Sequence, residues 1–278
     1  MPTIDELKKK LETGELTTAD VIANGWMCSV TQRIGKVKQP RGGYIKPKAF
    51  TVTELDGGGI DDLNPEENIT PGLVGIAVDY LTRFMSGTPV HEAFHISGLG
   101  ADIVGETKLY EQLVREVTGL DHPSICAAVK LAGFDSAYRA GVMAYRPVQD
   151  IYPDDATVEN IRTMVERSLA FFEAYGPKVM DGLTFEGGYT AYVTTGDGDF
   201  LTEDTLWDFK VSKQKLANKY TLQLLMYWRM GLHSVHPEYG KVRYLGVYNP
   251  RQNLVYRLAV DDIPAEVIEE VERDVIGY

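Results

Sequence analysis

The segment 196–210 constrains the fold more than any other part of this chain. It predicts two short strands, at 199–202 and 205–211, joined by a turn. Side chains alternate between the two faces of a strand, so Asp208 and Lys210 point to the same face. The apolar residues of the second strand point to the other face; they are Trp207, Phe209 and Val211. We expect them to anchor this strand in a core.

An acid and a lysine on one strand face, beside an acid on the neighbouring strand, indicate a specific chemistry. Two carboxylates can hold a hard divalent cation, and a lysine next to them can orient an attacking water. Asp199, Asp208 and Lys210 are therefore candidate catalytic residues for phosphodiester hydrolysis, with Mg²⁺ or Mn²⁺ as the cofactor. The main-chain carbonyl of Phe209 is a further candidate ligand. Asp197 remains an alternative to Asp199, because the pattern does not fix where the first strand begins.

A helix is predicted at about 214–230, because apolar residues recur there at helical spacing and Gly231 can end it. Gln223 and Tyr227 are four residues apart on this helix and share a face. Lys219 lies one turn earlier on the same stripe. The helix therefore presents an ammonium group, an amide and a hydroxyl along one side.

The remaining pattern predicts a mixed sheet with helices on its N-terminal side. Aromatic and β-branched residues indicate strands at 184–193, 242–248 and 253–260, the last two turning at Asn249-Pro250. The dipeptide Thr70-Pro71 can start a helix, since it places a capping residue before a proline at the first helical position. Further helices are expected near 106–118, 124–133 and 156–175, with an amphipathic helix within 261–274.

The order of these motifs resembles the nuclease core of the PD-(D/E)XK superfamily, in particular its RecB-like, phage-type exonuclease branch. The branch's Gly-x-x-Asp, Asp-x-Lys and Gln-x-x-x-Tyr motifs fall on Gly196, Asp199, Asp208, Lys210, Gln223 and Tyr227. The resemblance covers about residues 186–260. It implies an α/β fold with a mixed sheet and a restriction-endonuclease-like core, elaborated by helices on the N-terminal side. It also implies a metal-dependent DNA exonuclease, in which Gln223 and Tyr227 contact the DNA.

Two positions depart from the branch's pattern. Val211 stands where the branch often has threonine, and Gly198 stands where an apolar strand residue is usual. Neither departure removes a chemical group that the reaction needs.

A second, shorter match lies upstream, where the sequence Gly-Thr-Pro-Val-His at 87–91 resembles the branch's helix-borne Gly-Thr-x-Val-His motif. The resemblance implies that His91 joins the metal site. His95 and Glu92 remain alternatives, because they lie within one helical turn of it. Glu186 is either a supplementary ligand or a charge at a strand edge, and we favour the second interpretation.

The net charge of −12 argues, on its own, against a nucleic-acid partner. Its distribution weakens that argument, because residues 261–274 hold seven acids and one base, a net charge of −6. Residues 33–48 contain six lysines and arginines and no acid, and we interpret them as an extended basic arm able to follow a phosphate backbone.

We expect residues 1–69 to supply an N-terminal helix and this arm, packed on a nuclease domain of residues 70–278 as one structural unit. Three lysines just after the predicted catalytic strand form a second basic patch, where we expect the DNA backbone to pass; they are Lys213, Lys215 and Lys219.

Several site types are excluded by composition. Cys28 and Cys126 are too few to build a four-thiolate iron–sulfur cluster. The acids around 197–208 do not follow the ligand spacing of a calcium-binding EF-hand loop. The sequence has no apolar run of membrane-spanning length, so we expect a cytoplasmic protein with no membrane partner.

Two other functions remain open at this stage. A catalytically inert module with the same fold could bind nucleic acid or protein, and the acidic net charge would suit it. A small-molecule hydrolase could use the same acids, although the sequence has no glycine-rich phosphate loop. We favour the nuclease, with linear DNA bearing free ends as the substrate. The resemblance further implies a recombination partner protein.

Overall fold

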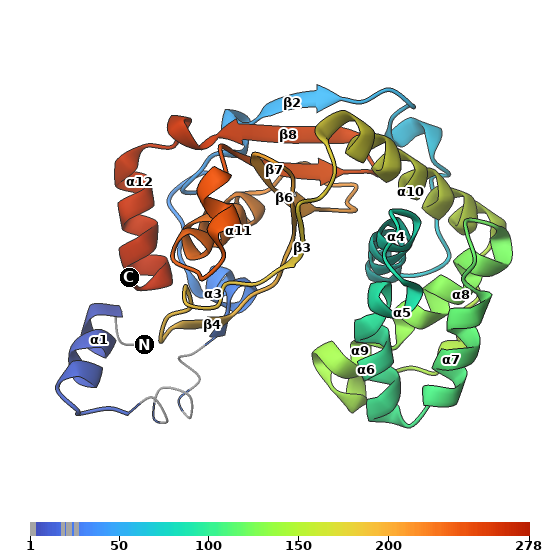
Figure 1. Ribbon diagram of the computed structural model, residues 1–278, viewed down its shortest axis with the longest axis horizontal. Coiled ribbons are helices and arrows are strands. Elements are labelled where there is room, and N and C mark those ends of the chain that lie inside the picture. Colours follow the sequence, from blue (N-terminus) through green and yellow to red (C-terminus); the bar gives the residue numbers. More distant parts are fainter. Residues whose placement is uncertain (1–3, 18–19, 21–23, 25–27) are drawn as a thin grey trace.

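A six-stranded mixed sheet organises the chain (Figure 1). The computed structural model describes residues 4–17, 20, 24 and 28–278. From one edge to the other the strands are β2 (Thr51–Glu54), β8 (Leu254–Ala259), β7 (Tyr244–Asn249), β6 (Thr205–Phe209), β5 (Gly198–Leu201) and β3 (Met180–Leu183). β6 and β7 pair in parallel, and the other neighbours pair antiparallel. A separate parallel pair is formed by β1 (Cys28–Ser29) and β4 (Val193–Thr195). The expected α/β fold with a mixed sheet is confirmed.

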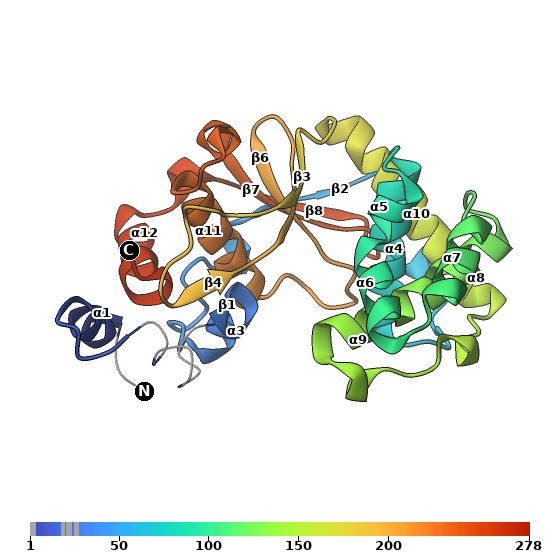
Figure 2. The ribbon, with the colours of Figure 1, turned by 60° about the horizontal axis from the view of Figure 1, so that its bottom comes forward.

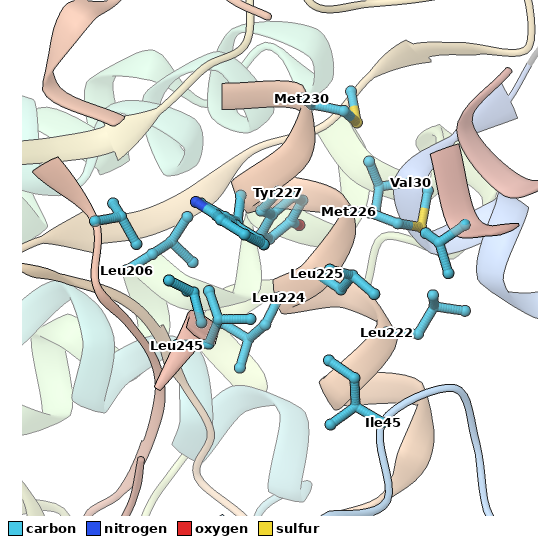
Figure 3. Close-up of a cluster of buried hydrophobic side chains, with 14 of the residues drawn as sticks. Val30, Ile45, Leu206, Leu222, Leu224, Leu225, Met226, Tyr227, Met230 and Leu245 are labelled. Atoms are coloured by element: carbon cyan, nitrogen blue, oxygen red, sulfur yellow. The ribbon is translucent and has the colours of Figure 1, made fainter. Parts of the chain in front are cut away.

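Two helices, α10 (Asp155–Tyr175) and α11 (Asn218–Leu232), cover opposite faces of the sheet. Leucines of α11 pack with Leu206 and Leu245 on one face (Figure 3). On the other face the ring of Phe171, from α10, lies 4.8 Å from that of Trp207, measured between centroids. Trp207 is fully buried, as its place on the apolar face of the strand predicts. Asp208, the next residue, therefore points toward the α11 side.

A helical part with its own apolar core lies beside the sheet (Figure 2). Its helices are α4 (Pro71–Met85), α5 (Val90–Ala93), α6 (His95–Val104), α7 (Thr107–Glu116), α8 (His122–Gly133) and α9 (Asp135–Ala140). The helices expected near 106–118, 124–133 and 156–175 are confirmed as α7, α8 and α10. α4 begins as predicted, because the Thr70 side chain accepts a hydrogen bond from the Leu73 N–H. α10 packs against α4 and α8 and so connects the helical part to the sheet.

The two ends of the described chain add helices to the sheet side. They are α1 (Ile4–Glu12), α3 (Val30–Lys36), α12 (Ala265–Glu270) and a π-helical turn, η7 (Val271–Ile276). Short 3₁₀ helices are η1 (Pro47–Ala49), η2 (Ile60–Asp62), η3 (Val142–Ala144), η4 (Val148–Asp150), η5 (Pro237–Lys241) and η6 (Val260–Asp262). The helix predicted within 261–274 is found as α12 and η7. Because β2 is a strand of the main sheet, the segment before residue 70 is part of the core architecture and not an appendage.

The strand expected at 184–193 is wrong, because a loop with tight turns occupies most of that range between β3 and β4. Gly187 has a φ of +88°, a conformation that favours glycine. Gly188 approaches the end of α11 so closely that a Cβ there would lie 2.0 Å from the Met230 carbonyl oxygen. The two glycines therefore mark a turn against α11 and not a bulge in a strand.

The basic stretch 33–48 is not extended along its whole length. Arg33 lies in α3 and is buried. Its guanidinium donates hydrogen bonds to the main-chain carbonyls of Asp274 and Val275, each at 2.8 Å, and so holds the C-terminal turn. Arg33 is therefore occupied structurally, whereas other members of the stretch remain exposed, namely Lys38, Arg41, Lys46 and Lys48.

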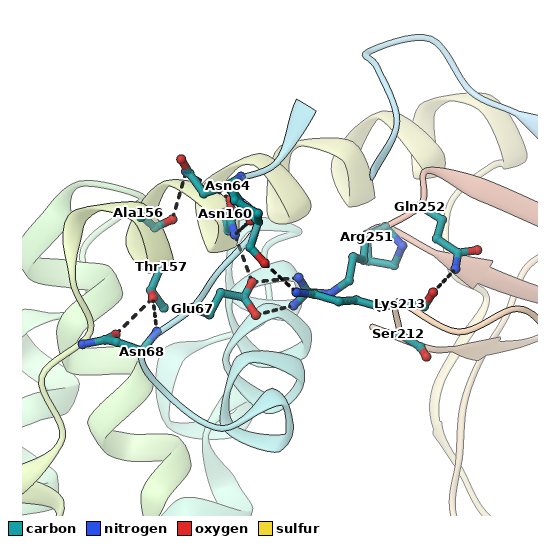
Figure 4. A network of polar contacts seen from close by, with 12 residues as sticks. Asn64, Glu67, Asn68, Ala156, Thr157, Asn160, Ser212, Lys213, Arg251 and Gln252 are labelled. Atoms are coloured by element: carbon teal, nitrogen blue, oxygen red, sulfur yellow. Dashed lines mark hydrogen bonds and ion pairs between the residues drawn. The ribbon is translucent and has the colours of Figure 1, made fainter. Parts of the chain in front are cut away.

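A buried ion pair joins the helical part to the sheet (Figure 4). Arg251, in the turn between β7 and β8, donates to both carboxylate oxygens of Glu67, at 2.8 and 3.0 Å. Their side chains are only 3% and 5% exposed. Glu67 also accepts a hydrogen bond from Asn160 on α10 at 3.1 Å. Asn249, the last residue of β7, donates to the Ser212 carbonyl at 2.8 Å and so holds the chain just after β6.

Candidate active site

The β5–β6 hairpin brings the two predicted acids together. Phe200 pairs with Trp207, so the antiparallel register places Asp199 opposite Asp208 on the same face. The Asp199 carboxylate accepts a hydrogen bond from the Phe209 N–H at 2.5 Å. The pairing is local, because a short turn joins the two strands and the turn sets their register.

Lys210 completes this group. Its Nζ lies 2.7 Å from one carboxylate oxygen of Asp208, whose side chain is 2% exposed. The second oxygen, Oδ2, is buried and has no hydrogen-bond partner within the described part of the chain. A buried carboxylate oxygen without a partner is costly unless a cation or donor satisfies it. The site therefore contains one acceptor position that the protein itself leaves unfilled.

The electrostatics of the three groups are coupled. Burial, followed by the charge of Asp208, raises the pKa of Asp199 to about 7, although Lys210 opposes this shift. Burial also raises the pKa of Asp208, again against the effect of Lys210. Burial alone would lower the pKa of Lys210, but the two carboxylates outweigh it and the pKa is raised. Lys210 therefore stays protonated at neutral pH and acts as a hydrogen-bond donor, while Asp199 is poised to lose a proton when a cation approaches.

A third acid, Asp79, faces the same place from α4. It lines a pocket of about 290 Å³ together with Asp199 and Phe209. Its charge is one of the causes that raise the pKa of Asp199, and it forms an ion pair with Arg83 at 3.2 Å. Sequence reasoning missed Asp79. The available signal was a charged residue in a helix whose other positions are largely apolar.

His91, which was predicted to join the metal site, does not line this pocket, and neither do its alternatives His95 and Glu92. His91 is on α5, more than half exposed, with its Nδ1 3.9 Å from a carboxylate oxygen of Glu111. His95 and Glu92 are also exposed, and none of the three lines the pocket that contains Asp199. The structure therefore does not bring His91 to the acids, because the turn at 87–89 starts a new helix beyond α4. From the helical part, Asp79 on α4 shares the pocket with Asp199.

Tyr227 and Gln223, both on α11, hold the chain that leads into β5. The Tyr227 hydroxyl accepts a hydrogen bond from the Gln223 amide at 2.8 Å and donates one to the Asp197 carbonyl at 2.7 Å. Its ring is 2% exposed and stacks on Phe185 at 5.0 Å. A Cβ at Gly198 would lie 3.2 Å from the Leu183 side chain and 3.4 Å from this ring, so the position leaves little room for a side chain. This burial does not fit the predicted contact of Tyr227 with nucleic acid, and it makes Tyr227 a positioning residue for the strand of acids.

The alternative of Asp197 is addressed by the same contacts. Asp197 is exposed, and the hydrogen bond that it receives goes to its main-chain carbonyl. Asp199, two residues on, lines the pocket and lies opposite Asp208. Of the two acids, Asp199 is the one that the geometry brings to the site.

Lys219 lies near Lys210, because both contact the ring of Tyr220. It is exposed, and its Nζ is 4.7 Å from the centre of the Tyr220 ring. The Nζ of Lys210 is 5.2 Å from the same ring. Tyr220 thus contacts both Lys210 and Lys219 through cation–π interactions. Sequence reasoning gave this tyrosine no role in the site.

The donor set fits a divalent cation in part. Among the described residues no three His, Cys, Asp or Glu side chains form a ready-made metal cluster. The two acids and the unpartnered Oδ2 of Asp208 nevertheless suit Mg²⁺, which keeps several waters and commonly uses only one or two carboxylates with substrate phosphate. Asp199 and Asp208 would hold such an ion. Glu186 takes no part in this group, because it pairs with His236 at 2.9 Å.

Comparisons with models of protein families, with curated proteins and with solved structures return no match. Within the described chain, no helix combines the length and the apolar character needed to cross a bilayer. The functional argument therefore depends on the geometry of the site.

The raised pKa of Asp199 predicts a pH dependence of stability in the absence of divalent cations. Between its ordinary value of 3.8 and about 7, the folded state binds more protons than the unfolded state. The free energy of unfolding should therefore fall as pH rises through this window, by up to about 4 kcal/mol from this group. Urea unfolding in EDTA at several pH values should show a flatter pH dependence for Asp199→Asn than for the wild type.

The same carboxyl predicts how the stabilisation by a divalent cation depends on pH. Mg²⁺ or Mn²⁺ should raise the stability of the wild type more at pH 8 than at pH 5.5, because the ion competes with the proton on Asp199. Equal pH slopes for the wild type and Asp199→Asn would contradict the assignment of the shift to this carboxyl.

Proposed function

We propose that this chain is a Mg²⁺- or Mn²⁺-dependent deoxyribonuclease with a restriction-endonuclease-like core. The observation that supports it best is the group of Asp199, Asp208 and Lys210, in which a buried carboxylate oxygen lacks a partner. The arrangement of an acid-bearing hairpin, a strand ending in Asp-x-Lys and the α11 helix between parallel strands β6 and β7 supports the fold assignment.

Each side chain has a distinct role in the proposed reaction. Asp199 and Asp208 hold the cation, and Asp79 adds negative charge from α4. When bound, the cation would polarise the scissile phosphate and stabilise the leaving oxygen. Lys210, kept protonated by its neighbours, donates a hydrogen bond to the attacking water or to the phosphate as charge develops. Tyr227 keeps Asp199 in place through the hydrogen bond to the preceding chain.

We further propose that the enzyme acts on linear DNA from its ends and works beside a recombination partner protein. Both points come from the resemblance to phage-type exonucleases and not from a contact in the molecule. Exposed lysines near the site, including Lys219, would contact the DNA backbone. Gln223 is bonded to Tyr227 and would reach DNA only by changing this partner.

A second candidate function is a catalytically inert binding module. The net charge of −12 and the lack of three clustered ligands among the described residues favour it. It predicts binding without cleavage.

The deciding experiment compares end-labelled linear DNA with closed circular DNA, in Mg²⁺, Mn²⁺ or EDTA, for the wild type and Lys210→Ala. Metal-dependent loss of linear DNA alone, abolished in Lys210→Ala, is the expected result for an exonuclease. Cutting of the circle as well would establish an endonuclease. No cleavage by the wild type in either metal would reject the catalytic proposal and favour the inert module.

A further inference from the structure

A second, larger pocket lies on one face of the sheet, where β2 pairs with β8. It has a volume of about 730 Å³ and shares no lining residue with the pocket that contains Asp199. The register of the two strands places Val52 opposite Tyr256 on its floor. Its walls come from η1, from η2 and from the loop 213–216. The pocket is large enough for a small organic ligand, since such sites commonly measure about 300–1,000 Å³.

The inside of this pocket is largely aliphatic. Val52 is 52% exposed, and Ile60, on η2, is 38% exposed. Leu216 and Leu254 line the same pocket and are only partly buried. Aliphatic side chains that stay open on one concave surface suit the apolar face of a planar ring, because its burial removes both surfaces from water.

Three lysines line the pocket from two of its walls. Lys48 comes from η1, whereas Lys213 and Lys215 come from the loop that follows β6. All three are exposed, and no ion pair among the described residues includes any of them. Their ammonium groups therefore give the walls a positive charge that the protein's own carboxylates do not neutralise, and an anionic ligand would be complementary to it.

The turn between β7 and β8 holds two of the walls in place (Figure 4). Gln252 donates to the main-chain carbonyls of Lys213 and Gln214, each at 3.0 Å. The next residue, Asn253, donates to three main-chain carbonyls within 55–58, at 2.9, 3.1 and 3.0 Å, and so holds the segment that leads from β2 to η2. A pocket whose walls are already fixed loses little conformational entropy when a ligand binds.

We propose that this pocket binds a nucleotide as a free ligand, with its base on the aliphatic floor and its phosphates at Lys48, Lys213 and Lys215. Phosphate oxygens complement ammonium groups in charge and in hydrogen bonding. Glu54 and Asp61 also line the pocket and can accept hydrogen bonds from ribose hydroxyls or from an amino group of the base. An inorganic anion would make no use of the floor, and a hydrocarbon would make no use of the lysines.

This inference goes beyond the proposed nuclease, because no lining residue belongs to the candidate catalytic group. The test is therefore a binding measurement, by isothermal titration calorimetry on the purified chain in EDTA, where no metal-dependent cleavage takes place. The titrants are ATP, inorganic pyrophosphate and a single-stranded oligothymidylate. The last is included because a nucleotide within a strand presents the same chemistry as a free one.

Two variants change different parts of the pocket. Lys48→Ala with Lys215→Ala removes two ammonium groups, and Val52→Ser removes part of the floor at a side chain that is half exposed. The control is Lys108→Ala with Lys241→Ala, which makes the same change of net charge at exposed lysines that do not line the pocket.

We expect the wild type to bind ATP and the double lysine variant to bind it about tenfold more weakly or worse, because two charge-assisted contacts are lost. Val52→Ser should weaken the binding of ATP about threefold and leave that of pyrophosphate unchanged, since only the base contacts the floor. The control should match the wild type with every titrant.

Four results would overturn the inference. The first is that ATP does not bind, and the second is that the control loses as much ATP affinity as the double lysine variant. The third is that pyrophosphate binds as tightly as ATP, which would indicate an anion site without a place for the base. The fourth is that only the oligothymidylate binds, which would assign the lysines to a DNA path. Because no cleavage is measured, the proposed nuclease and this site can fail independently.

Discussion

Asp208→Asn should lower the rate of DNA cleavage by about a thousandfold or more while the fold persists. Asparagine has the same shape as aspartate, but it removes the charge that faces the unfilled position at Oδ2. It also removes the nearest anion to Lys210, which lies 2.7 Å away. The variant therefore loses the negative charge that attracts the cation, together with the partner that orients the catalytic ammonium group.

Two further variants in the same hairpin provide controls. Asp197→Asn should retain a rate near that of the wild type, because this side chain is exposed and only its main-chain carbonyl is hydrogen-bonded. Glu203→Gln, at the exposed turn between β5 and β6, should behave in the same way. Single-turnover rates with saturating Mn²⁺ and circular dichroism spectra would be compared across the set. A larger loss in Asp197→Asn than in Asp208→Asn would reverse the assignment of the metal ligands.

The hairpin and the helix after it were predictable because their signals are local. The alternation of Trp207 and Asp208 fixed which side chain is buried against α10 and which faces α11. The position of Asp199, opposite Asp208 on β5, then follows from the register of the two strands. The same local reasoning placed the turn at Asn249-Pro250 and the start of α4.

The contacts between distant segments were not predictable in this way. Asp79 lines the pocket with Asp199 through tertiary packing, since α4 lies against α10, far from β5 in sequence. His91 matched a short motif, but its own helix points it toward Glu111. A motif match gives a residue type and a position in the chain. A metal ligand must also be brought close to the other ligands by the tertiary structure, which a short motif does not encode.

Polar residues on a helix stripe were also ambiguous in sequence. Tyr227 carries a hydroxyl and a ring that suit DNA contact, yet both are used within the protein. Arg33 belongs to a basic stretch, yet it binds main-chain carbonyls of the C-terminal turn. In each case burial, which depends on the packed structure, decides between a surface role and a structural one.

Breaking the buried pair between Glu67 and Arg251 should destabilise the protein by about 3–5 kcal/mol. Glu67→Gln leaves a guanidinium that is 3% exposed without its anion, and Arg251→Met leaves the opposite charge unpaired. Each single change should lower the free energy of unfolding in urea by a similar amount. As a control, Glu159→Gln removes the ion pair between Glu159 and Arg162. The Glu159 side chain is 55% exposed, so this change should lower the free energy of unfolding by less than about 1 kcal/mol.

The double variant Glu67→Leu with Arg251→Met distinguishes the effect of the ion pair on protein stability from its effect on the position of α4. Two apolar side chains of similar volume remove both buried charges at once, so much of the lost stability should return. Glu67 lies just before α4 and Arg251 lies in the turn that holds Ser212, so the pair also sets Asp79 against the end of the catalytic strand. We therefore expect the double variant to recover its urea midpoint but to cleave DNA about tenfold more slowly than the wild type, since misplaced catalytic groups lose rate steeply. Full recovery of both stability and rate would show that the ion pair has no part in positioning α4.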